Sequence, residues 1–235
     1  MNPKRLSLGL LFSAVVFCAG AVFAQDDSTP ASTPEEREAF YTQTIEHRVQ
    51  DILKVLALKD AAKASRVHDV IILQYRSLRA RDAAIVAKLK ESGNTNADMA
   101  ARSSMARSLS KPLHEWFISV LALDLTPEQV DAVKDQMTYN KVKVTFDAYC
   151  NIVPNLTDAD KAKIKELLIV AREEAMDGGS AGEKSAVFQK FKDQINEYLN
   201  ANGHDVAKAY KDWEAKQPVQ QADARSATPA PAPAK

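Results

Sequence analysis

The stretch that decides the fold is TDADKAKIKELLIVAREEA, residues 157–175. Thr157 opens it with Asp160 three positions later, a loose form of the capping box that starts many helices. Apolar residues then recur at the three- and four-residue spacing of one helix face: Ile164, Leu167, Leu168, Ala171 and Ala175. This pattern predicts an amphipathic helix with a defined start.

The same kind of start occurs twice more along the chain. Thr126 is followed by Pro127 and, at the third helical position, by Gln129, and Asp60 offers a simpler cap. Apolar residues stand seven and eleven positions after each of the three caps: Val67, Ile71, Val133, Met137, Ile164 and Leu168. Either an old duplication or independent use of good capping chemistry explains the repetition.

Helical periodicity continues outside these starts. Further stripes run through Ile45–Leu56, Met105–Val120 and Phe188–Leu199, with a kink expected at Pro112 and glycines between the stripes. A last helix is expected over about Asp205–Lys216, with Trp213 as its docking anchor, and Trp116 is expected in the core. We therefore predict an all-α fold, a single bundle of six or seven helices with disordered termini.

Residues Thr138–Asn155 differ from the stripes around them. Their start lacks helix signals, and residues Lys141–Phe146 alternate polar and apolar side chains. Connections between bundled helices usually take 2–8 residues, and longer ordered loops are often functional. We expect a long aromatic-bearing loop here, which either contributes to a site or seals the end of the bundle.

The N-terminus predicts export. Lys4 and Arg5 precede a short apolar run, and Val22-Phe23-Ala24 suits cleavage after residue 24. The expected organisation is a signal peptide (1–24), a linker (25–34), a helical domain (35–216) and a disordered Ala/Pro-rich tail (217–235). The mature protein is then periplasmic or secreted, with no membrane span after signal cleavage.

Charge and composition argue against several classes of function. The chain has 31 basic and 31 acidic residues, and loss of Lys4 and Arg5 with the signal leaves a small negative charge, which disfavours nucleic acid as a partner. Cys150 remains alone, so no internal disulfide forms, and we expect it to be buried. The spacing of the histidines suggests no metal site, and no catalytic residues or cofactor are expected.

The C-terminal half carries a recognisable series of short motifs. They include Met137-Thr138-Tyr139, Pro154-Asn155-Leu156-Thr157, Arg172-Glu173-Glu174-Ala175-Met176-Asp177 and Asn196-Glu197-Tyr198-Leu199. The chain resembles the domain-of-unknown-function 3826 family over most of residues 40–210, most densely over 137–203. The resemblance implies a secreted helical protein for which sugar binding has been conjectured.

One acidic pair suggests a binding site. Glu173 and Asp177 are four residues apart, so they share a helix face, and Asp177 falls where the helix dipole disfavours an anion. Their repulsion predicts that Asp177→Asn leaves stability unchanged or slightly higher, unless Arg172, Lys184 or Lys190 neutralises the pair.

Sugar recognition combines flat aromatic faces with planar polar side chains. If the long loop covers the neighbouring helices, the ligand-binding set is Tyr139, Phe146, Tyr149, Asn155, Arg172, Glu173, Asp177 and Asn196.

These observations predict a non-enzymatic envelope protein that binds carbohydrate or assists polysaccharide use. Two alternatives stay open. Leu125-Thr126-Pro127-Glu128-Gln129 matches the Leu-Thr-x-x-Gln motif of small periplasmic chaperones, so the protein could hold client proteins instead. An unrecognised carbohydrate-active enzyme is the third reading.

Overall fold

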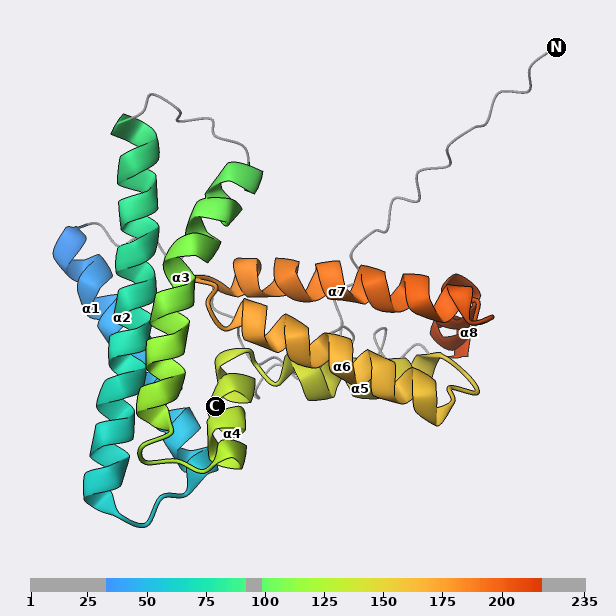
Figure 1. The fold of residues 1–235 in the computed structure, drawn as a ribbon, viewed down its shortest axis with the longest axis horizontal. Helices are drawn as coiled ribbons and strands as arrows, with labels where there is room; N and C mark the ends of the chain where they lie inside the picture. The colour runs from blue at the N-terminus through green and yellow to red at the C-terminus, as the bar shows by residue number, and fades with distance from the viewer. Residues whose placement is uncertain (1–32, 92–98, 217–235) are drawn as a thin grey trace, which may run out of the picture.

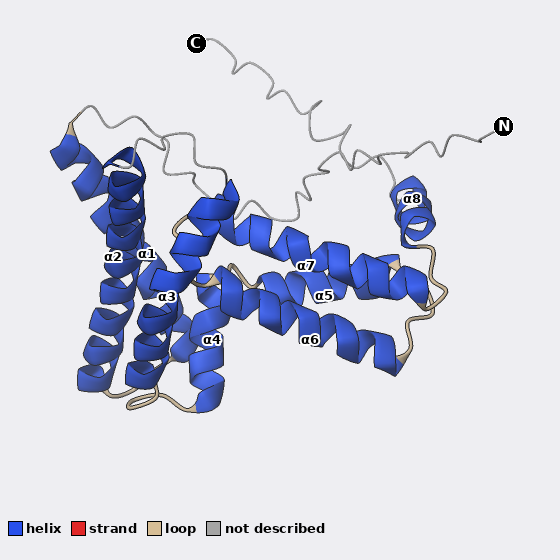
Figure 2. Ribbon diagram, turned by 45° about the horizontal axis from the view of Figure 1, so that its top comes forward, coloured by secondary structure: helices blue, strands red, loops and turns tan. Residues whose placement is uncertain are grey.

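The structure, a computed structural model, describes residues 33–91 and 99–216 and is all-helical over them (Figures 1 and 2). The expected all-α fold is confirmed, and the described residues form eight helices and no strand. The helices are α1 (Pro34–Leu56), α2 (Ala61–Glu91), α3 (Met99–Leu121), α4 (Pro127–Met137), α5 (Lys141–Ile152), α6 (Asp158–Ala175), α7 (Ala181–Ala201) and α8 (Val206–Lys216). The predicted signal peptide, most of the linker and the tail lie outside the described residues.

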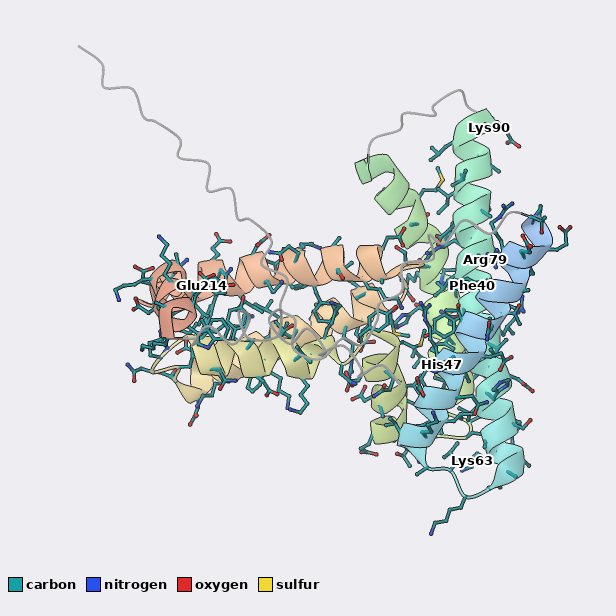
Figure 3. All side chains as sticks on the ribbon, turned by 180° about the vertical axis from the view of Figure 1, so that it is seen from behind. Phe40, His47, Lys63, Arg79, Lys90 and Glu214 are labelled. Atoms are coloured by element: carbon teal, nitrogen blue, oxygen red, sulfur yellow. The ribbon has the colours of Figure 1, made fainter. Side chains whose placement is uncertain are left out.

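The buried side chains form two clusters, where we expected a single bundle. The first is built from α1–α4, which we call the N-terminal unit, and the second from α5–α8, the C-terminal unit. Helices of the first unit run roughly vertically in Figure 1, whereas α5–α7 run horizontally with α8 at their far end, and α4 lies beside α6 where the two units meet. In Figure 3, Lys90 and Glu214 mark the ends of the two units far from this junction.

The three predicted caps are confirmed. The side chains of Thr126 and Thr157 accept hydrogen bonds from the third residue of α4 and α6 in full capping boxes, and Asp60 accepts from two amides at the start of α2. The apolar residues seven and eleven positions after each cap are all buried. The cap thus sets the face that each helix turns to the core.

Thr126→Ala is expected to lower the free energy of unfolding by about 1 kcal/mol, because the amide of Gln129 in the first turn of α4 loses the threonine hydroxyl that accepts from it. Chemical denaturation measures this change. An unchanged midpoint would contradict the assigned role of the cap.

The prediction of a long loop at Thr138–Asn155 was wrong, because most of this segment forms helix α5. Asn140 precedes α5 with positive φ and makes no capping hydrogen bond from its side chain, so no start signal was visible. The helix forms because its apolar side chains pack on α6–α8: Val142, Phe146, Tyr149 and Ile152. Packing outweighs the low helix propensity of its β-branched residues.

Two single-residue predictions in the helices were also wrong. Trp116 is 39% exposed, because Phe117 takes the inward position on α3, and Cys150 is exposed, because Tyr149 takes it on α5. One step along a helix turns a side chain by about 100°. The helix α3 continues through Pro112, and its N-terminal half leans away from α2 (Figure 1).

The turn between α6 and α7 joins the two units. Met176, directly after α6, is fully buried in the core of the N-terminal unit. Gly179 approaches α2 so closely that a Cβ atom there would lie 1.9 Å from Oδ2 of Asp82. Arg81 of α2 donates to the main-chain carbonyl of Asp177 at 2.8 Å. This turn therefore fixes how the C-terminal unit meets α2.

Candidate functional site

The predicted acidic pair lies at the junction of the two units. Nδ1 of His114, from α3, lies 3.2 Å from the carboxylate of Asp177, and its Nε2 lies 3.7 Å from that of Glu173. Lys134 of α4 approaches Glu173 to 3.0 Å. The acidic pair thus faces cations from other helices, and the expected repulsion between its members is offset.

Arg172 binds the two units together. Its guanidinium lies 2.7 Å from Asp131, 2.9 Å from Asp135 and 3.1 Å from Glu173, and its side chain is only 7% exposed. Nearby carboxylates raise the pKa of Arg172 against the opposing effect of burial. Arg172, Lys184 and Lys190 were the cations expected to neutralise the acidic pair, and among these Arg172 alone contacts it. Lys190 pairs with Glu174, and Lys184 donates to a main-chain carbonyl.

A second set of side chains lies on α2 at the junction. The guanidinium of Arg81 is buried, donates to Ser110 of α3 and pairs with Asp82. Gln74 stands seven residues earlier, on the same face of α2, and is fully buried with no hydrogen-bond partner for its amide in the described structure. Unpaired buried amides are uncommon in folded proteins and suggest bound water or ligand.

Lys184, in the first turn of α7, is buried beside one aromatic side chain, Tyr75, and one cationic side chain, Arg48. Its ammonium donates to the main-chain carbonyl of Met137 at 2.9 Å and lies 6.0 Å from the ring centroid of Tyr75. The guanidinium of Arg48, from α1, lies 5.9 Å from the same ring. Burial, and then the charge of Arg48, lower the pKa of Lys184 to about 7.

Tyr139 completes this group at the turn between α4 and α5. Its main chain has positive φ. Burial raises the pKa of Tyr75, the charge of Arg48 opposes the rise, and Tyr139 adds to it. Arg48 and Tyr139 are partly exposed, whereas Tyr75 and Lys184 are buried. We call Arg48, Tyr75, Tyr139, Asp177 and Lys184 the junction cluster.

The other predicted site residues lie elsewhere. Tyr149 is buried in the C-terminal unit, where its hydroxyl donates to Oδ1 of Asn196 at 2.7 Å, and Phe146 packs against the same core. The structure thus brings Tyr149 and Asn196 together, but as partners of each other. Asn155 is exposed, with positive φ, at the far end of this unit.

Asn155 lines an open cleft of about 340 Å³ between the α5–α6 connection and α8. Its other walls combine polar side chains with Val153, Pro154, Gly203 and Ala209; the polar ones are His204, Asp205, Lys208 and Asp212. Near the cleft, Nε2 of His204 lies 3.1 Å from Asp160, whose pKa is lowered mainly by hydrogen bonds from Thr157. Its lining contains no Phe, Tyr or Trp side chain.

The sequence did not identify Arg48, Tyr75 or Lys184 as site residues. They are far apart in the chain and stand in unremarkable helical positions. A charged residue at a position that helical periodicity assigns to the core, as for Lys184 four residues before Phe188, is the one local signal available.

The described residues hold no group of His, Cys, Asp and Glu side chains placed to bind a metal ion. Among the eight helices, none combines the length and apolar character needed to cross a bilayer.

Asp177→Asn is expected to lower stability by about 1–2 kcal/mol at pH 5.5 and by less at pH 8.5. The hydrogen bond to Asp177 is the main reason that the pKa of His114 is raised above 6.5, against the effect of burial. A raised folded-state pKa adds stability that is complete below the unfolded value and lost as pH rises through the folded one. Equal losses at both pH values in denaturation would contradict this pairing.

The comparisons with known proteins add a family and no activity. The family model described as "Protein of unknown function (DUF3826)" matches residues 42–218, which cover all eight helices except the start of α1. A search of curated proteins finds no match to the chain. Because the family model covers most of its length, the chain belongs to the DUF3826 family.

Proposed function

We propose that this protein is a non-enzymatic carbohydrate-binding protein of the cell envelope, and that its ligand binds at the junction cluster. The observation that carries the proposal is that the guanidinium of Arg48 and the ammonium of Lys184 lie 5.9 Å and 6.0 Å from the ring centroid of Tyr75, with Tyr139 and Asp177 acting electrostatically on the same group. Aromatic faces pack on the C–H faces of sugars, and planar polar groups bind their hydroxyls. Export of the chain rests on the charged and apolar pattern of residues 1–24.

The junction suits a sugar better than the distal cleft does. The lining of the cleft beside Asn155 has no Phe, Tyr or Trp side chain. At the junction, Arg48 and Lys184 lie 5.9 Å and 6.0 Å from the ring centroid of Tyr75, and the ring of Tyr139 is partly exposed. Binding sites are commonly built between packed units in this way.

A glycan array probed with the purified full chain, followed by calorimetry on the glycans retained, tests the proposal. We expect saturable binding to at least one glycan and a loss of about tenfold in affinity for Tyr139→Ala, whose ring is partly exposed. Tyr210→Ala, which removes a ring from α8 far from the junction, is the control. Failure to bind any glycan would contradict the proposed function.

One observation favours the alternative of a chaperone or adaptor. Leu109 and Trp116 lie seven residues apart on one face of α3, both partly exposed, and Leu123 beyond its end is 82% exposed. Exposed apolar faces bind other proteins. Suppression of client aggregation that is lost in Trp116→Lys, without any glycan binding, would favour this alternative.

A further inference from the structure

Arg48 and Lys184 are cations without a carboxylate partner. Neither forms an ion pair with any residue in the described ranges 33–91 and 99–216: Arg48 contacts the face of Tyr75, and Lys184 donates to the carbonyl of Met137. Most cations at this junction are paired, as Arg172 is with three carboxylates. The two cations of the junction cluster are therefore exceptions within a well-paired surface.

The nearest carboxylates do not neutralise these cations by contact. Asp177 pairs with His114, and the carboxylate of Glu183 accepts from the amide of Gly179. Both act on Lys184 only through space, and Arg48 acts on it in the opposite sense. A buried cation without a counter-charge, such as Lys184, is costly, and with Arg48 beside the same ring it creates a local preference for an anion.

Four side chains of the junction cluster differ in their exposure to solvent. Lys184 and Tyr75 are buried, whereas Arg48 and Tyr139 are partly exposed and can meet a ligand from solvent. A ligand whose anionic group reaches Arg48 and Lys184 would thus place the rest of the molecule against Tyr139. This fits a small ring that carries a charge, such as one terminal sugar of a chain.

We propose that the junction cluster binds the carboxylate of an acidic sugar, with Arg48 and Lys184 on the carboxylate and Tyr139 beside the sugar ring. This inference rests on the proposed function and adds the class of ligand. The planar fork of an arginine matches a carboxylate, and hydrogen bonds between opposite charges are stronger than neutral ones.

The test compares sugars that differ in charge alone. Trisaccharides of galacturonic, mannuronic and glucuronic acid are titrated into the full chain by calorimetry, each beside its methyl ester and a sulfated analogue. At least one acid is expected to bind about tenfold or more tightly than its ester, because the ester keeps the ring and loses the charge.

Two variants on α1 locate the effect. Arg48→Gln removes a charge from a side chain that makes no hydrogen bond, and it is expected to reduce the acid-to-ester ratio to within about twofold. Lys54→Gln removes the same charge from the same helix at a side chain that is 73% exposed, and it should leave the ratio unchanged. Circular dichroism verifies that both variants fold.

Each result decides between the claims. Equal binding of acid and ester, a ratio that survives Arg48→Gln, or tighter binding of the sulfated analogue would overturn the carboxylate assignment and leave carbohydrate binding intact. No binding of these trisaccharides, together with no glycan retained on the array, would overturn the proposed function as well.

Discussion

Replacing Arg172 with methionine is expected to lower the free energy of unfolding by about 3 kcal/mol. The guanidinium is 7% exposed and bridges Asp131 and Asp135 of α4 to Glu173 of α6. Removing one member of a buried ion pair leaves the others uncompensated and typically costs 3–5 kcal/mol. We expect the lower end of that range, because the three carboxylates keep some contact with water.

Chemical denaturation at pH 7 measures this loss against two matched variants. Lys163→Met removes a cation from an exposed pair on the same helix and should change stability by less than about 0.5 kcal/mol. Adding Glu173→Gln to Arg172→Met should restore part of the loss, because one uncompensated charge is gone. A loss below about 1 kcal/mol for Arg172→Met would contradict its role in joining the units.

The second large effect concerns Lys184 and pH. Burial, followed by the charge of Arg48, lowers the pKa of Lys184 in the folded protein to about 7, against the smaller opposing effects of Asp177 and Glu183. An unfolded lysine titrates near 10.4. Between these values the unfolded chain binds more protons, so this group makes the folded state more stable as pH rises from 7.

Between pH 7 and pH 9 the free energy of unfolding of the wild type is therefore expected to rise by about 2–3 kcal/mol relative to that of Lys184→Met. The expected slope is about 1.4 kcal/mol per pH unit. Denaturation of both proteins at the two pH values measures the difference, in which other titrating groups cancel. A parallel pH dependence would contradict burial of a charged Lys184. Lys190→Met, at an exposed position further along α7, is the control.

Helix starts were predictable where the sequence carries both a capping residue and its hydrogen-bond partner. Thr126 and Thr157 carried both a cap and its partner, so the starts of α4 and α6 were predictable. Helix α5 follows Asn140, which has positive φ and makes no capping hydrogen bond from its side chain. Its helical form depends on packing against α6–α8. That packing is not visible in residues 138–155 alone.

The site was predictable in part for the same reason. Glu173 and Asp177 were visible as neighbours on one helix, but their partner His114 stands about 60 residues earlier. Arg48, Tyr75 and Lys184 meet only because the α6–α7 turn packs against α2. No spacing within one helix encodes such a contact.

Amide hydrogen exchange with and without the tightest-binding glycan of the array tests most directly that the junction is the binding site. The account predicts slower exchange in residues 44–50, 72–78, 137–141 and 176–187, which carry the junction cluster, and unchanged exchange around the distal cleft. Protection confined to residues 153–155 and 203–212 would contradict it and place the ligand in that cleft.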